Sequence, residues 1–168
     1  LIRQDIEGET DEQKNANARY AIDRGVDAIG LHVCDNFEAS HIDILLKDID
    51  LKKIEVNFLS CPGRALKVAA ALVDYLKARG LENDFRGSVS FDPFKRLLKH
   101  GTKFPKDMVA MAKELMETVK DVPGLRCFTI DSFMLNNAGA YITQELGYAL
   151  AWGAQWLTSL SDAGLKAG

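Results

Sequence analysis

The chain contains 168 residues, of which 47% are hydrophobic and 27% are charged, a composition typical of a globular protein with one substantial core. Its formal net charge of −3 argues against a nucleic-acid partner, because phosphate binding requires a concentrated basic surface. No apolar run approaches the ~20 residues of a membrane-spanning helix, and no secretory signal is visible. We therefore expect a cytoplasmic protein that binds neither nucleic acid nor membrane.

Five short apolar runs are predicted as strands, and each leads into a helical stretch. The predicted strands are residues 1–6, 26–33, 53–60, 86–91 and 125–131. The predicted helices are residues 11–24, 62–79, 93–100, 105–120 and 137–161. Glycine after Arg24 and Arg79 and proline at position 62 mark helix ends and a helix start.

Strands that alternate with helices predict an α/β fold with a parallel sheet and right-handed crossovers. A doubly wound open sheet and part of a (β/α) barrel both fit this pattern. Neither a G-x-G-x-x-G sequence nor a P-loop follows any predicted strand, so a nucleotide-binding function finds no support.

Polar residues at the carboxyl ends of the strands are the candidates for chemistry, because parallel α/β folds place their sites there. These candidates are Asp5, His32, Cys34, Ser60, Cys61, Asp92, Asp131 and Ser132. His32 and Cys34 form an incomplete metal pair, since zinc needs three or four ligands and no second cluster supplies them. Cys61 precedes a helix start that would lower its pKa, and it becomes a nucleophile only if the fold brings His32 or His41 to it.

Asp92 and Asp131 could form an acid–base pair. Asp92, however, precedes Pro93 at a helix start, where an aspartate commonly caps the helix. We favour capping for Asp92 and leave the role of Asp131 open. The three cysteines, of which Cys127 is the last, are far apart and form no C-x-x-C pair, so we expect free thiols in a reducing cytosol.

The last predicted helix carries small residues at Gly147, Ala151 and Ala154, which share one stripe. Aromatic residues, among them Trp152 and Trp156, project from neighbouring positions. We interpret this helix as packed tightly on a sheet through its small residues, with the aromatic side chains at the rim.

Two segments, residues 138–153 and residues 87–97, resemble the methylmalonyl-CoA mutase family. Residues 138–153 read A-G-A-Y-I-T-Q-E-L-G-Y-A-L-A-W-G and are similar to the A-G-A-x-x-x-x-E-x-A-Y-x-L-A-x-G signature of that family. Residues 87–97, G-S-V-S-F-D-P-F-K-R-L, are similar to the G-x-x-x-x-D-P-F segment of its small subunits, and residues 1–6 look like their early barrel strand. The resemblance implies a partial (β/α)8 TIM-type barrel of about five βα units. Residues 1–168 would then form a single domain, cut from that barrel and lacking the cobalamin-binding domain.

The departures from the family pattern fall on its reacting residues. The catalytic subunit reads S-G-Y-H-M-Q-E before A-G-A, and its Tyr and His contact corrin and substrate. The same register places Phe133 and Met134 in this chain, while Ser90 stands at a substrate-binding Gln and His100 near a carboxylate-binding Arg. A positioned acid–base His contributes roughly 10²–10⁴ in rate. The resemblance therefore implies a vacated site with no catalytic, cofactor-binding or metal-binding residue.

The resemblance implies a non-catalytic small-subunit component of adenosylcobalamin-dependent methylmalonyl-CoA mutase, which interconverts methylmalonyl-CoA and succinyl-CoA. Its partner would be a homologous catalytic large subunit, and the fragment itself would bind no cobalamin, since no D-x-H-x-x-G motif surrounds any histidine. One alternative is a stand-alone barrel enzyme that uses the strand-end groups Asp92, Asp131, His32 and Cys61. Another is a CoA-binding subunit without turnover, with Asp131, Asp92 and His32 as a residual polar site.

Five strands of a barrel would leave an apolar inner face and two sheet edges uncovered. We therefore expect the fragment to self-associate and cover that face, with Trp152 and Trp156 contributing to the contact.

Overall fold

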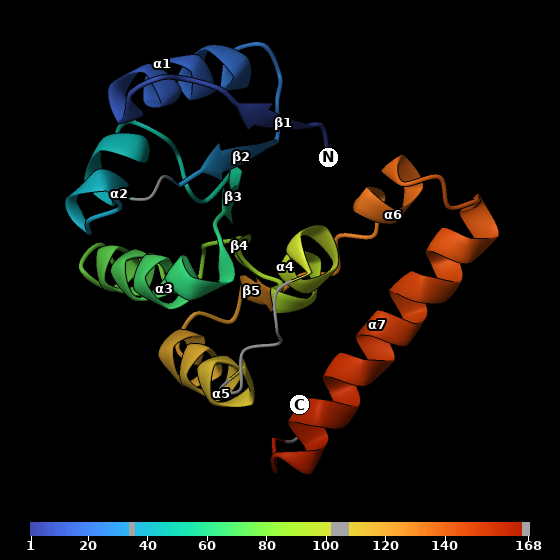
Figure 1. The fold of residues 1–168 in the computed structure, drawn as a ribbon. Coiled ribbons are helices and arrows are strands. Elements are labelled where there is room, and N and C mark those ends of the chain that lie inside the picture. Colours follow the sequence, from blue (N-terminus) through green and yellow to red (C-terminus); the bar gives the residue numbers. More distant parts are fainter. Residues whose placement is uncertain (34–35, 102–107, 166–168) are drawn as a thin grey trace. The chain divides into compact units, whose positions relative to one another are not determined.

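The computed structural model describes residues 1–33, 36–101 and 108–165. Strands and helices alternate along it (Figure 1), as the sequence pattern predicts. In chain order the elements are β1 (Arg3–Ile6), α1 (Asp11–Ile22), β2 (Ala28–His32), α2 (Ser40–Leu45), β3 (Glu55–Leu59), α3 (Pro62–Lys77), β4 (Gly87–Phe91), α4 (Pro93–His100), α5 (Met108–Val119), β5 (Leu125–Phe128), α6 (Phe133–Asn137) and α7 (Ile142–Asp162). The five strands form one parallel sheet in the order β1-β2-β3-β4-β5, which confirms the predicted fold class and is compatible with part of a TIM-type barrel.

The chain divides into two compact units. The first comprises Leu1–Phe91 with Leu115–Cys127, and the second comprises Asp92–Glu114 with Phe128–Gly168. The first unit therefore holds nearly all of the sheet, and the second holds α4, α6 and α7. The prediction of a single domain over residues 1–168 stays a prediction.

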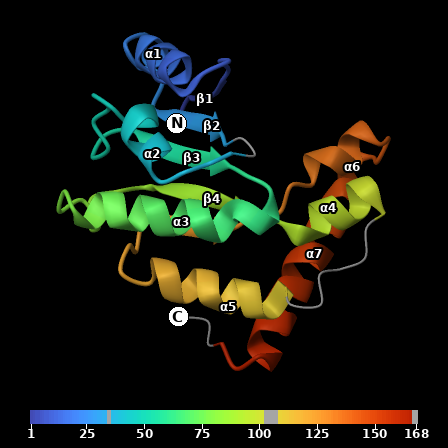
Figure 2. The ribbon, with the colours of Figure 1, turned by 60° about the vertical axis from the view of Figure 1, so that its left-hand side comes forward.

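The helices α1, α2 and α3 of the first unit lie on one side of the sheet (Figure 2). The sheet buries an apolar face there, made of Ile29, Leu31, Val56, Phe58 and Val89. Helix α3 begins at Pro62, whose fixed φ suits the first turn. Its buried side chains recur every three or four residues, at Ala65, Val68, Ala69, Leu72, Val73 and Leu76. This two-layer packing forms the core of the first unit.

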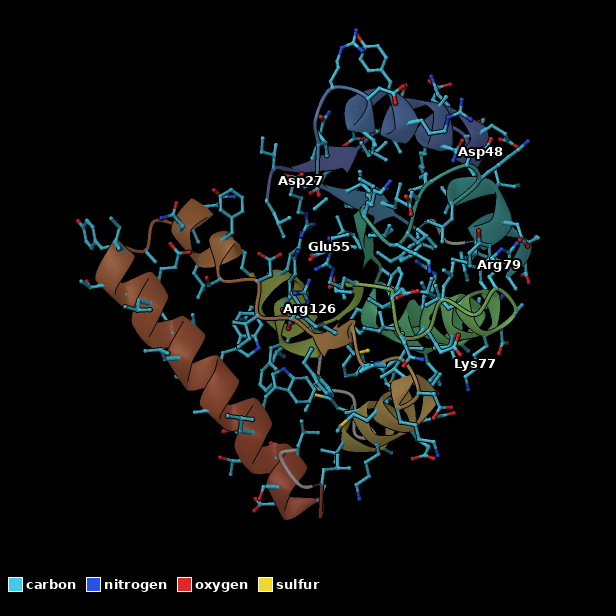
Figure 3. All side chains as sticks on the ribbon, turned by 180° about the vertical axis from the view of Figure 1, so that it is seen from behind. Asp27, Asp48, Glu55, Lys77, Arg79 and Arg126 are labelled. Atoms are coloured by element: carbon cyan, nitrogen blue, oxygen red, sulfur yellow. The ribbon has the colours of Figure 1, made fainter. Side chains whose placement is uncertain are left out.

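The opposite face of the sheet is polar. Asp5, Gly30, Asn57 and Ser88 are in register across the first four strands. The Ser88 hydroxyl donates to Asn57 Oδ1 at 2.6 Å, and Asn57 is buried. Arg126 points toward Glu55 (Figure 3) and donates to its Oε1 at 2.6 Å. The expected apolar inner face is therefore wrong for this unit, because ion pairs and hydrogen bonds occupy it.

Several element boundaries differ from the predicted ones, and two short helices were not predicted. Strand β5 ends at Phe128 rather than at residue 131. Helix α2 was not predicted, since its six residues are too short to show a period, although it buries Ile42 and Leu45. The last predicted helix, residues 137–161, corresponds to α7, which begins later, at Ile142; the short helix α6 before it was not predicted, and Gly139, with φ +97°, lies between the two. Residues 105–107 of the fourth predicted helix lie outside the described residues.

Candidate functional site

The best-defined polar cluster surrounds Asp92, the first residue after β4. Its side chain is the N-cap of α4, and Oδ1 accepts the backbone N–H of Lys95 at 3.1 Å. Its Oδ2 accepts the backbone N–H of Asp131 at 3.2 Å, from the segment that follows β5. The capping role predicted for Asp92 is confirmed. Both carboxyl oxygens are thus engaged by backbone donors from two different segments.

The neighbouring charges pair with one another. The Lys95 ammonium contacts the Asp131 carboxylate in a half-exposed ion pair. The next residue, Ser132, donates its hydroxyl to Glu145 Oε1 at 3.1 Å and so joins the segment to α7. Sequence reasoning missed both Lys95 and Glu145. Lys95 lies three residues after the cap, and Glu145 is the glutamate of the family signature, so each left a local signal.

Burial sets the electrostatics of the cluster. Asp92 is only 4% exposed, and desolvation raises the pKa of its carboxyl from 3.8 to about 6. The nearby Asp131 carboxylate also raises this pKa, whereas the two N–H donors and the Lys95 ammonium lower it. The desolvation of the charged form is the largest of these effects.

The second unit also contains a cluster of aromatic side chains. Trp152 and Trp156 are 6% and 3% exposed, and both contact the ring of Phe94 edge-on, with centroid distances of 5.7 and 5.5 Å. The ring of Phe128 lies 5.2 Å from Trp156. Such pairs contribute about 0.5–1.5 kcal/mol each beyond the area they bury. Helix α7 is therefore anchored by its tryptophans.

The interpretation of the small-residue stripe is wrong. Gly147, Ala151 and Ala154 are exposed, and a Cβ at Gly147 would meet open space. The buried side of α7 is the aromatic one, so Trp152 and Trp156 are not available for the predicted role in self-association. The large apolar side chains that α7 leaves exposed are Ile142, Leu146, Tyr148, Leu150 and Leu157.

The positions implied as vacated differ in their surroundings. Phe133 opens α6 and is 65% exposed, while the following Met134 is half-buried. Ser90 is half-buried in β4, and its backbone carbonyl accepts the Ser60 hydroxyl at 3.3 Å. The backbone of His100 closes α4, but its side chain lies outside the described part of the structure. Neither Phe133 nor Met134 carries a group that can transfer a proton.

The remaining candidates do not assemble into a nucleophilic site. His32 is exposed at the end of β2, and its carbonyl accepts the buried Lys14 ammonium at 2.9 Å. Cys61 is a free, half-buried thiol just before α3. Among the described residues no hydrogen bond or ion pair joins Cys61 to a histidine, and His41 instead faces Asp11 at 3.0 Å. Cys34 lies outside the described residues.

Within residues 1–33, 36–101 and 108–165, no group of three or more His, Cys, Asp or Glu side chains is placed to hold a metal ion. Over the same part of the chain, no helix combines the length and apolarity required to cross a membrane. Of the four strand-end groups of the stand-alone enzyme hypothesis, the described contacts bring only Asp92 and Asp131 together.

Comparison with known proteins points to one family. A family model described as methylmalonyl-CoA mutase matches residues 26–168. The methylmalonyl-CoA mutase small subunit of Porphyromonas gingivalis is 41% identical over 173 residues, which cover 99% of this chain and 27% of that protein. The small subunits of Propionibacterium freudenreichii subsp. shermanii and Streptomyces virginiae are 28% and 33% identical, over 87% and 64% of this chain and 23% and 17% of their own lengths. The chain thus spans between 17% and 27% of the length of these curated relatives.

Proposed function

The chain belongs to the methylmalonyl-CoA mutase family, and we propose that it forms part of a mutase small subunit that supports assembly and carries no catalytic residue. The relatives named as small subunits support this assignment. The parent complex would be cytoplasmic, and a homologous large subunit would perform the isomerisation of methylmalonyl-CoA and succinyl-CoA.

One observation carries the non-catalytic part of the proposal. The polar groups at the carboxyl ends of β4 and β5 are engaged with one another, since Asp92 accepts two backbone N–H groups and Asp131 pairs with Lys95. A general acid or base must instead reach the proton of a substrate within about 2.6–3.2 Å. The cluster therefore has the features of a structural joint, and the adjacent Phe133 and Met134 offer no substitute.

The chain's own residues do not fit cobalamin. The family's cobalt-binding motif, D-x-H-x-x-G, is absent, and the described histidine that has a carboxylate partner, His41, lies on α2 against Asp11 of α1. We therefore assign adenosylcobalamin to the parent complex, bound outside this chain, and derive no step through it.

Reconstitution tests the proposal. The full-length protein that carries this chain, the homologous large subunit and their mixture are each assayed for conversion of methylmalonyl-CoA with added adenosylcobalamin. We expect turnover from the mixture and none from the protein alone. Turnover by the protein alone would overturn the proposal.

The variant Asp131→Asn separates a structural role from a catalytic one. In the reconstituted complex we expect it to retain turnover within about twofold, whereas loss of a positioned acid or base costs about 10²–10⁴. Size-exclusion chromatography provides the control, because the amount of complex must be the same for both forms. A loss of 10² or more at unchanged complex content would make Asp131 catalytic. Calorimetric titration of the full-length protein with CoA tests the alternative of a subunit that binds CoA without turnover: binding heat from a protein that shows no turnover would favour that alternative.

A further inference from the structure

One buried carboxyl joins two segments of the second unit. Asp92, at the N-terminus of α4, receives the Lys95 N–H of its own helix at 3.1 Å and the Asp131 N–H of the segment after β5 at 3.2 Å. The second bond ties residues 129–132 to α4, and Ser132 extends the connection to Glu145 of α7. Opening of residues 129–132 would break the Asp131 bond and admit water to the Asp92 carboxyl.

The charged groups described around Asp92 come from both segments. Lys95 on α4 offers a positive charge, and Asp131 on the opposing segment offers a negative one. Because Lys95 and Asp131 form an ion pair, their opposite effects on the pKa of Asp92 offset one another. The burial of Asp92, which is 4% exposed, therefore dominates its titration.

We propose that Asp92 is a proton-dependent latch, which holds residues 129–132 closed on α4 more tightly when its carboxyl is protonated than when it is ionised. A protonated carboxyl keeps an oxygen that accepts an N–H, and it carries no charge that must be withheld from water in the closed state. An ionised carboxyl keeps both N–H bonds, but in the closed state it is withheld from water.

The direction of the pH effect follows from the thermodynamic linkage between protonation of Asp92 and closing of residues 129–132. In the closed state burial raises the pKa of Asp92 to about 6, while in an open, hydrated state it returns toward about 3.9. A group whose pKa is raised in the closed state favours closing below the open-state value and loses that contribution as pH rises through the closed-state value. The two-unit difference corresponds to about a hundredfold change in the opening equilibrium. Closing is therefore favoured by acid, and opening becomes easier between about pH 4 and pH 6.

Hydrogen exchange measured by mass spectrometry tests the latch in the full-length protein. Peptides covering residues 129–137 are followed from pH 4 to pH 7, and the observed rates are divided by the intrinsic exchange rates. We expect the opening equilibrium of the wild-type protein to rise about a hundredfold over this range and then level off. Peptides from α3 in the first unit serve as the internal control and should show no such rise.

Two variants decide whether Asp92 is responsible. Asp92→Asn keeps a capping side chain that does not titrate, so the pH dependence should disappear. Lys95→Met removes the cation that lowers the pKa of Asp92, so the levelling-off should move to higher pH. A flat wild-type profile, or a profile in Asp92→Asn that matches the wild type, would overturn the proposal. If Asp92→Asn fails to fold, an unshifted profile in Lys95→Met overturns it equally.

Discussion

Replacing Trp156 by alanine should separate the two sides of α7. Trp156 is 3% exposed and lies between the rings of Phe94 and Phe128, at 5.5 and 5.2 Å. Removal of a buried Trp side chain costs about 3–5 kcal/mol, from lost burial and from the cavity left behind. A domain of ordinary stability has only about 5–15 kcal/mol to lose. We therefore expect α7 of the Trp156→Ala variant to open at low denaturant concentration.

The adjacent Leu157 provides a matched control, because it is 67% exposed. Leu157→Ala should change the free energy of unfolding by no more than about 0.5 kcal/mol. Urea unfolding is followed by tryptophan fluorescence, which comes from Trp152 alone in Trp156→Ala and from both tryptophans in Leu157→Ala; Trp152 contacts the same Phe94 ring. Equal losses from the two variants would show that the aromatic cluster does not anchor α7, and a larger loss from Leu157→Ala would reverse the assignment of its faces.

One glycine substitution in each unit probes packing. Gly87→Ala should lower the free energy of unfolding in urea by about 3 kcal/mol or more, because its Cβ would lie 2.0 Å from the carbonyl oxygen of Val56. Gly147→Ala, whose Cβ meets open space in mid-helix, should stabilise α7 by up to about 1 kcal/mol, and similar effects at both sites would contradict the backbone clash. Burial raises the pKa of the Cys127 thiol to about 12, so alkylation at pH 8 followed by mass spectrometry should label half-buried Cys61 well before Cys127, and equal labelling in the folded chain would contradict this order.

The local features of the fold were predictable from the sequence, because each depends on residues that are close together in the chain. Alternating apolar runs and helix-end residues specify each strand and helix within about a dozen positions. Asp92 was assigned as a cap for the same reason, since its partner Lys95 is three residues away. The start of α7 was placed too early, at residue 137 rather than Ile142, because the alanines around Gly139 favour a helix, whereas that glycine adopts a positive φ outside it.

The contacts that determine which faces are polar and which are buried join residues that are far apart in the sequence. Glu55 and Arg126 are 71 residues apart, so no local pattern announces their ion pair or the polar face to which it belongs. The bond from Asp131 to Asp92 spans 39 residues and turns a helix cap into a joint between segments. The exposed face of α7 was misassigned because small and aromatic residues occupy adjacent stripes, and only packing shows which stripe is buried.

The strand order has a consequence for how the chain acquires its structure during synthesis. Because spatial order equals chain order, each strand from β2 onward finds the neighbour it needs already emerged from the ribosome. The contacts that link successive strands and their flanks close loops of similar size, with separations of 25, 28 and 31 residues. Each of these loop closures therefore carries a similar entropic cost. The sheet can grow one strand at a time from the N-terminus, with the newest edge always the next strand's template.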